Sequence, residues 1–156
     1  MNLAGRVETL SEPKLTGVAL HEAGHILVGS LYGYECADAW ITPTGAGQAQ
    51  VGPEPGEGSI EAEICISLAG YVAQGISLDD DFLLGQIAAT RKEVWPEDHF
   101  DVRKAFRRMI AAAPKASDIK LLSDYRHFET LTRDKLNEID NRARLERIAR
   151  DLQAGG

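Results

Sequence analysis

Two histidines four positions apart flank a glutamate in the segment His21-Glu22-Ala23-Gly24-His25. On a helix, residues four apart leave the same face one turn apart, so both imidazoles can reach one metal ion. Glu22 lies roughly 100° around such a helix from His21, where it can reach a metal-bound water without being a ligand. The pattern therefore predicts a zinc site held by His21 and His25, with Glu22 as the general base of a hydrolase.

Two other interpretations of these residues involve no metal. In the first, the histidines are solvated on a surface helix; in the second, the histidines and Glu22 form a self-contained buried hydrogen-bond network. The apolar neighbours of the motif disfavour the surface helix, because they leave it no polar face to show to water. These neighbours are Val18, Ala19, Leu20, Ala23, Ile26, Leu27, Val28 and Leu31. Polar groups inside such a segment must be hydrogen-bonded, paired or bound to metal.

A catalytic zinc site of this kind needs a third protein ligand and an open position for water. Acidic residues and one histidine in the later segments are the candidates, and spacing alone does not choose among them. The candidates are Glu61, Glu63, residues 79–81, Asp98, His99 and Asp101.

Apolar periodicity predicts a mainly α (α+β) fold, with one small β element between the first two core helices. We expect the first helix to begin at Ser11-Glu12-Pro13 and to continue to Tyr32, with Gly33 ending it. A short strand over residues 37–42 and a return strand over residues 48–52 follow, separated by a turn.

Later segments also show helical spacing. A second core helix is predicted over residues 59–76, and a third, with Ser77 as its N-cap, runs to about Lys92. A fourth opens at Trp95-Pro96-Glu97-Asp98 and is broken by Pro114. From Ser117-Asp118 to residue 153 the pattern is amphipathic and helical. We expect one metallopeptidase-like domain over residues 1–156, with its core at about 12–152.

The motif and its surroundings resemble the protease domain of the FtsH family, the membrane-anchored ATP-dependent zinc metalloproteases. Besides residues 21–29, similar segments are Trp40-Ile41-Thr42-Pro43 with Gly45, residues 66–73, Asp101-Val102-Arg103-Lys104-Ala105 and residues 145–152. The likeness runs from about residue 14 to residue 152, and HEAGH is its most specific part. In the family, the aspartate of the stretch that Asp101 begins is the third zinc ligand. The resemblance therefore implies that His21, His25 and Asp101 bind Zn²⁺.

The chain also departs from the family pattern. Trp95-Pro96-Glu97-Asp98-His99-Phe100 replaces a small, Thr/Ser/Gly-rich loop before the third ligand, so Asp98 stays an alternative to Asp101. Gln74-Gly75 stands where the family has an acidic pair. The sequence has no G-x-x-x-x-G-K-[ST] phosphate-binding loop and no predicted transmembrane helix. The resemblance therefore implies a stand-alone peptidase domain without its ATPase.

The predicted function is zinc-dependent hydrolysis of peptide bonds in unfolded or flexible polypeptides, with Glu22 accepting a proton from the attacking water. As in the family, an extended peptide is expected to add to the edge of the strand around residues 40–43. The alternatives are a non-catalytic zinc-containing protein-binding module, or a peptidase that needs an unfoldase or regulatory partner in trans. The intact Glu22 favours the enzyme, because a structural zinc site needs no general base.

The bulk composition limits the partners. The chain has 24 acidic and 17 basic residues and a formal net charge of −7, which gives no electrostatic reason to bind nucleic acid. The basic residues of the predicted fourth helix are interpreted as a solvated face; they are Arg103, Lys104, Arg107 and Arg108.

The cysteines and the N-terminal residues indicate the compartment. Cys36 and Cys65 form no Cys-x-x-Cys pair and are predicted to be free, mostly buried thiols. No secretory signal or membrane segment is predicted, so we expect a soluble, cytoplasmic protein.

Overall fold

The computed structural model describes residues 14–52, 58–94 and 99–155. Within these ranges the chain forms six helices and one two-stranded antiparallel sheet, which lies between the first two of the helices. The prediction of a mainly helical fold with one small β element at this place is confirmed. No helix in the described ranges is both long enough and apolar enough to cross a bilayer.

Helix α2, Gly17–Leu31, carries the HEAGH motif. It begins where the Thr16 hydroxyl accepts a hydrogen bond from the backbone N–H of Ala19 (3.1 Å), which satisfies one of the unpaired donors of the first turn. The predicted start at residues 11–13 lies outside the described residues, but residues 14–16 are not helical, so the helix is shorter than expected. It ends, as predicted, just before Gly33, whose φ is +83°.

The sheet is a hairpin of β1, Cys36–Ile41, and β2, Gly47–Val51. Ala39 and Ile41 pack against the apolar core beneath the hairpin. Trp40 alternates to the opposite face, and its side chain is 42% exposed. Cys36 is also exposed, whereas Cys65 is buried, so the prediction of mostly buried thiols holds only for Cys65.

The next three helices are α3, Ile60–Gln74, α4, Asp80–Arg91, and α5, Phe100–Ala112. The second core helix is confirmed. For α4 the predicted cap was wrong: Asp79, not Ser77, accepts a hydrogen bond from the backbone N–H of Phe82 (2.7 Å). A carboxylate is favoured there by the helix dipole. The predicted opening of α5 at residues 95–98 lies outside the described residues.

The amphipathic region beyond Ser117 is divided into two helices, α6, Asp118–Asn137, and α7, Ile139–Gln153. The division falls at Glu138, whose extended backbone (φ −60°, ψ 138°) ends α6. Asn141 in the first turn of α7 donates a hydrogen bond to the Lys135 carbonyl (2.8 Å), which gives a partner to one of the last acceptors of α6.

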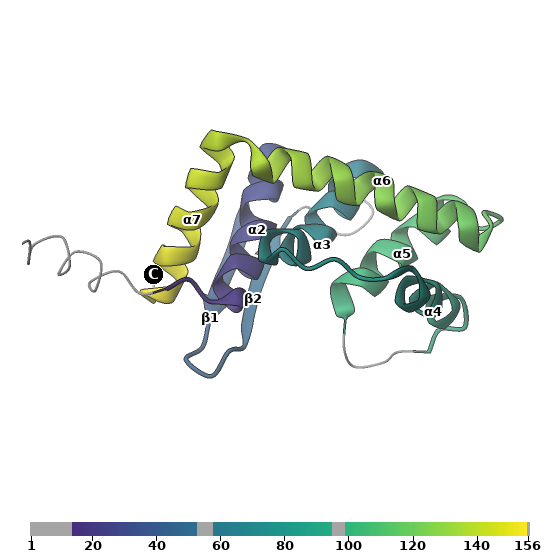
Figure 1. The fold of residues 1–156 in the computed structure, drawn as a ribbon, viewed down its shortest axis with the longest axis horizontal. Coiled ribbons are helices and arrows are strands. Elements are labelled where there is room, and N and C mark those ends of the chain that lie inside the picture. The colour runs from purple at the N-terminus through teal and green to yellow at the C-terminus, as the bar shows by residue number, and fades with distance from the viewer. Residues whose placement is uncertain (1–13, 53–57, 95–98, 156) are drawn as a thin grey trace, which may run out of the picture.

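Two groups of buried apolar side chains hold these helices together. The first core lies between α2, α3, α7 and the end of α6; the second core lies between α3, α4, α5 and the start of α6. Figure 1 shows α6 running along the top of the molecule, with α7 beside α2 at one end and α4 and α5 at the other. Helix α3 contributes to both cores, Cys65 and Ala69 to the first and Ile64 and Leu68 to the second.

Helices α2 and α3 approach each other closely at Gly24. A Cβ at Gly24 would lie 2.5 Å from the carbonyl oxygen of Ala69, a distance that a real side chain could not tolerate. Gly24, the second variable position of the His-Glu-x-x-His motif, is therefore fixed by packing, and this packing places the histidine face of α2 against α3.

Candidate metal centre

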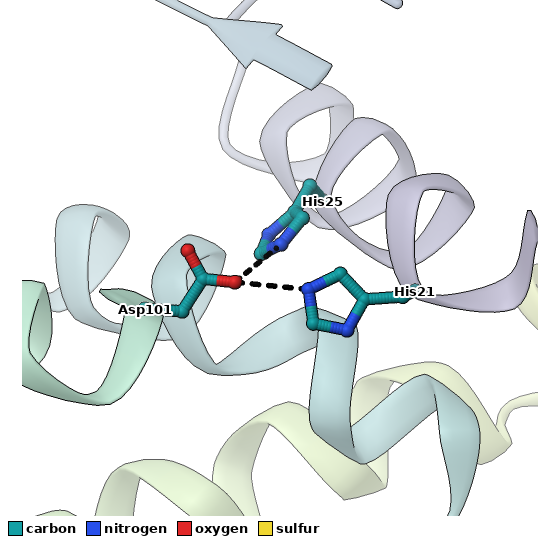
Figure 2. A group of neighbouring side chains, drawn as sticks. All are labelled: His21, His25 and Asp101. Atoms are coloured by element: carbon teal, nitrogen blue, oxygen red, sulfur yellow. Dashed lines mark hydrogen bonds and ion pairs between the residues drawn. The ribbon is translucent and has the colours of Figure 1, made fainter. Parts of the chain in front are cut away.

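His21, His25 and Asp101 converge on one point, as Figure 2 shows. The Nε2 atoms of His21 and His25 lie 2.9 and 3.0 Å from the same oxygen, Oδ2 of Asp101. One potential ligand atom from each of the three residues lies within 4.8 Å of the other two. Thus the two histidines of α2 and the first-turn aspartate of α5, which the sequence separates by 76 residues or more, form one cluster.

Gly70 on α3 makes the room for His21. A Cβ at Gly70 would overlap with the imidazole ring of His21, so no other residue fits without moving that ring. The Tyr71 ring also packs against His21 in an edge-to-face arrangement, with 5.2 Å between the ring centroids. The ring of His21 is therefore held by two neighbours on α3.

Each histidine also makes a hydrogen bond through its other ring nitrogen. Nδ1 of His25 lies 2.6 Å from the carbonyl oxygen of Ile66, and Nδ1 of His21 lies 2.7 Å from Oε1 of Gln74. A carbonyl oxygen only accepts, so both Nδ1 atoms must donate a proton. This fixes the tautomer in which Nε2 carries the lone pair, the form of histidine that binds a metal ion.

The consequence is that three electron-rich atoms face one another. With Nδ1 protonated, a neutral His21 and a neutral His25 both direct lone pairs at Oδ2 of Asp101, which is also an acceptor. Such an arrangement is unfavourable unless positive charge lies between the three atoms, as protons on both rings or as one cation.

The distances from Asp101 to the two histidines are close to those between two ligands of one zinc ion. Two ligands that each lie 2.0–2.1 Å from a tetrahedral Zn²⁺ are about 3.3 Å apart, a few tenths of an ångström more than the 2.9 and 3.0 Å found here. Two imidazoles and one carboxylate are also a donor set that zinc accepts. His21, His25 and Asp101 therefore present a set of donor atoms that can hold this metal.

The electrostatics of the cluster follow from burial and proximity. Burial alone would lower the pKa of His21, but its hydrogen bonds to Asp101 and Gln74 outweigh that effect and raise the pKa above its ordinary value. Burial would raise the pKa of Asp101, but hydrogen bonds from the two histidines hold it well below its usual range. Asp101 is therefore ionised at neutral pH, as a metal ligand must be.

Glu22 lies beside this cluster and is not part of it. Its side chain is only 8% exposed and borders the same cleft as the two histidines. Burial raises the pKa of the carboxyl group above its ordinary value, against the opposing effect of the nearby histidines. A carboxylate with a raised pKa next to a metal centre is suited to accept and return a proton.

The cluster forms part of the wall of an open cleft of about 740 Å³. The opposite wall is strand β2 with Gly52, and Phe100 and Lys104 of α5 border the same space. Within the described residues, β2 pairs only with β1, so its other edge has no strand partner. Residues 40–43 do not line the cleft, whereas β2 borders it over its whole length and Ala37 of β1 borders it at one point.

Most of the other candidate ligands have different partners. Glu61 accepts a hydrogen bond from the Tyr32 hydroxyl (2.8 Å), and Glu63 pairs with Arg108. His99 Nδ1 lies 3.0 Å from the Tyr71 hydroxyl oxygen. None of these belongs to the cluster formed by the described residues.

Asp79 and Asp80 interact at the start of α4. Asp79 caps the helix, and Asp80 pairs with Arg126 (2.6 Å). Both interactions are structural, because they fix the start of α4 and join it to α6. Asp98, the alternative to Asp101, lies outside the described residues.

Sequence reasoning missed the support that α3 gives to the histidines. Ile66, Gly70 and Gln74 stand four residues apart on one face of α3. The first binds His25 through its carbonyl, the second makes space for His21, and the third binds His21. The signal in the sequence is a glycine one turn before a polar residue inside an otherwise apolar helix, a combination that often marks close packing around a polar group.

Comparison of the chain with known protein families and with curated proteins gives no match. The likeness to the FtsH protease domain therefore depends on the motifs alone.

Proposed function

We propose that this chain is a zinc-dependent peptidase that hydrolyses peptide bonds in unfolded or flexible polypeptides. The observation that carries the proposal is that the three-residue cluster borders an open cleft. Structural zinc sites are closed by four protein ligands, whereas catalytic sites have three and leave a position for water or substrate. Three protein ligands beside an open cleft favour catalysis over the alternative of a zinc-containing binding module.

The chemistry divides between the metal and Glu22. Zinc at this site would lower the pKa of water to about 7 and polarise a peptide carbonyl. Glu22, at the border of the same cleft, accepts the proton as water attacks the carbonyl carbon and then gives it to the leaving amine. The hydrogen bonds from His21 to Gln74 and from His25 to Ile66 keep both imidazoles oriented during this step.

Strand β2 is the proposed binding edge for the peptide. An extended peptide that pairs with the unpartnered edge of β2 would pass along the cleft in front of His21 and Glu22. A folded protein uses its backbone groups in its own hydrogen bonds, so it cannot offer such a strand without local opening. This restricts the proposed substrates to unfolded or flexible chains.

The resemblance to the FtsH protease domain supports the same reaction. In this proposal His21, His25 and Asp101 take the places of the family's zinc ligands. Because the sequence has no phosphate-binding loop, we expect the activity of the purified chain to be independent of ATP. An unfoldase supplied by another chain would extend the substrates to folded proteins.

The decisive experiment compares wild type with Glu22→Gln. Zinc per chain is measured by atomic absorption, and cleavage is followed on a reduced, alkylated, unfolded test protein. Both proteins should carry close to one zinc. Cleavage by Glu22→Gln should fall at least about a hundredfold, the usual contribution of a positioned general base.

Glu35→Gln is the matched control, because Glu35 is exposed and borders neither the cluster nor the cleft. It should cleave like wild type. Equal cleavage by Glu22→Gln and wild type would contradict the proposed role of Glu22. Absence of cleavage by zinc-loaded wild type would favour the binding module.

A further inference from the structure

A second cavity, of about 470 Å³, adjoins the cleft. Val51, Phe100 and Lys104 line both spaces. Val51 is the last residue of β2, and Phe100 directly precedes the proposed ligand Asp101. A peptide lying along β2 can therefore place a side chain in this cavity while its backbone stays beside the metal cluster.

One helical face of α5 forms a wall of the cavity. Phe100, Lys104, Arg107, Arg108 and Ala111 are spaced three or four residues apart, so their side chains leave the same side of the helix. The other walls come from α3 and from the end of β2, where Ile66 and Val51 supply apolar surface. The cavity thus combines an apolar lining with cationic groups.

The charges of the cavity differ in sign from the chain as a whole. Lys104, Arg107 and Arg108 line it against one acidic residue, Glu63, whereas the formal net charge of the chain is −7. Glu63 forms an ion pair with Arg108 at 2.5 Å, so that cation is already compensated. Lys104 has no ion pair with any carboxylate in the described part of the chain, and it lies where the cavity meets the cleft.

The interpretation of the four basic residues of α5 as a solvated face holds for Lys104 and Arg107, which are exposed, but is wrong for Arg103. Arg103 is buried, with 6% of its surface exposed, and lines neither space. The other three border the second cavity. Basic groups around a cavity beside the proposed catalytic site can bind an acidic group of a substrate there.

We propose that this cavity is a substrate subsite that selects a carboxylate next to the cleaved bond, on an acidic side chain or at the C-terminus of the peptide. The apolar part of the substrate residue would lie against Val51 and Ile66, and its carboxylate would meet the Lys104 ammonium group. Alternate residues of an extended chain point to the same side, so one register of the peptide on β2 brings one side chain to the cavity. This inference rests on the proposed peptidase function.

The test uses ten-residue alanine–serine peptides that are blocked at both ends. In one set a single Glu occupies each position in turn, and in the matched set Gln replaces it. Binding to zinc-loaded Glu22→Gln protein is measured by fluorescence anisotropy, and cleavage by wild type is measured in parallel. At the register that fills the cavity, Glu should bind about three- to tenfold more tightly than Gln, and 0.5 M NaCl should reduce the difference.

A third set of peptides carries Gln and a free C-terminal carboxylate. It separates the two sources of negative charge, an acidic side chain and the C-terminus of the peptide. Tighter binding of the free-ended peptides would assign the cavity to the chain terminus. Tighter binding of the internal Glu peptides alone would assign it to an acidic side chain. Either result supports a carboxylate subsite.

Charge reversal at Lys104 then tests whether the preference for Glu over Gln arises in the cavity. In the Glu22→Gln background, Lys104→Glu should abolish or invert the preference for Glu over Gln. Lys115→Glu changes the net charge by the same amount at an exposed position away from both spaces, and it should keep the preference. Equal effects of the two substitutions would overturn the inference, because the preference would then reflect the net charge alone.

The remaining outcomes separate this inference from the proposed function. If wild type cleaves the Gln peptides and no carboxylate improves binding at any position, the subsite is wrong and the peptidase stands. If no peptide is cleaved but the Lys104-dependent preference is found, the subsite stands and the peptidase is wrong. Absence of both binding and cleavage would overturn both.

Discussion

The two sides of the candidate metal centre are built in different ways. His21 and His25 lie one turn apart on a single helix that packs into the first core, so their relative position follows from helix geometry. Asp101 is on α5 in the second core, and it enters the cluster from the first turn of its helix. Helix α3 packs in both cores and against both α2 and α5, so it links the two sides. Local spacing thus provides two of the proposed ligands, and tertiary packing provides the third.

The largest expected effect on zinc affinity comes from removing the proposed ligands of each side in turn. A structural zinc site in a small domain binds with about 10–16 kcal/mol, so one ligand among three or four corresponds to about 3 kcal/mol, or about a hundredfold in affinity. Asp101→Ala should weaken zinc binding by about this factor, and the double variant His21→Ala/His25→Ala should carry no zinc. Competition with a chromophoric chelator measures the affinities.

Asp98→Ala is the control for the aspartate side and should bind zinc like wild type. Full zinc occupancy in the double histidine variant would contradict the assignment of His21 and His25 as ligands. A greater loss in Asp98→Ala than in Asp101→Ala would mean that the ligand lies about one turn earlier than the cluster places it.

The same difference explains how much could be predicted from the sequence. The pairing of His21 with His25 could be predicted because it needs only the helical repeat. The hairpin and the start of α6 at Ser117 could be predicted for the same local reasons. From spacing alone Asp101 was one of several candidates, and only the resemblance to a family singled it out, because no local pattern links residues that far apart.

The errors also have physical reasons. Asp79 caps α4 instead of Ser77 because either side chain can serve as a cap, and the packing of the following helix decides which one does. The peptide-binding edge was expected at residues 40–43, and that binding stays a prediction; those residues do not line the cleft, which β2 borders together with Ala37 of β1. The choice between two strands of one hairpin depends on which of them faces α2 and α5, and a sequence pattern does not report this.

The next variant, Gly70→Ala, tests the support that α3 gives to the two histidines. Gly70→Ala places a methyl group where the His21 ring now lies, so the ring must move. We expect zinc to bind at least about tenfold more weakly and the free energy of unfolding of the metal-free protein to fall by about 1–3 kcal/mol, as in other overpacked cores. Denaturant unfolding in the presence of a chelator and zinc competition measure the two quantities.

Gly85→Ala is matched to this variant, because Gly85 is also inside a helix but a Cβ there meets no atom within 4 Å. It should leave zinc binding unchanged and raise the free energy of unfolding by about 0.5–1 kcal/mol, since alanine is the better helix former. If both variants bound zinc equally well, the close approach of Gly70 to His21 would have no role in the site.

The smallest effect concerns the hydrogen bond between Gln74 and His21. The side-chain oxygen of Gln74 accepts the Nδ1 proton at 2.7 Å, which keeps Nε2 free for metal. Leucine has a similar volume but no acceptor, so Gln74→Leu should leave the buried Nδ1–H without a partner and weaken zinc binding about tenfold, the lower end for such supporting residues. Glutamate keeps the acceptor and adds negative charge, which makes the imidazole a better ligand, so Gln74→Glu should bind zinc a few-fold more tightly than wild type.

The opposite signs expected for the two variants separate an electronic role from a packing role, because both side chains fill nearly the same space. Zinc competition at fixed pH gives both affinities, and circular dichroism checks that each variant is folded. If the two variants changed zinc affinity in the same direction and by the same factor, Gln74 would act through its shape, and the tautomer of His21 would have to be set by another contact.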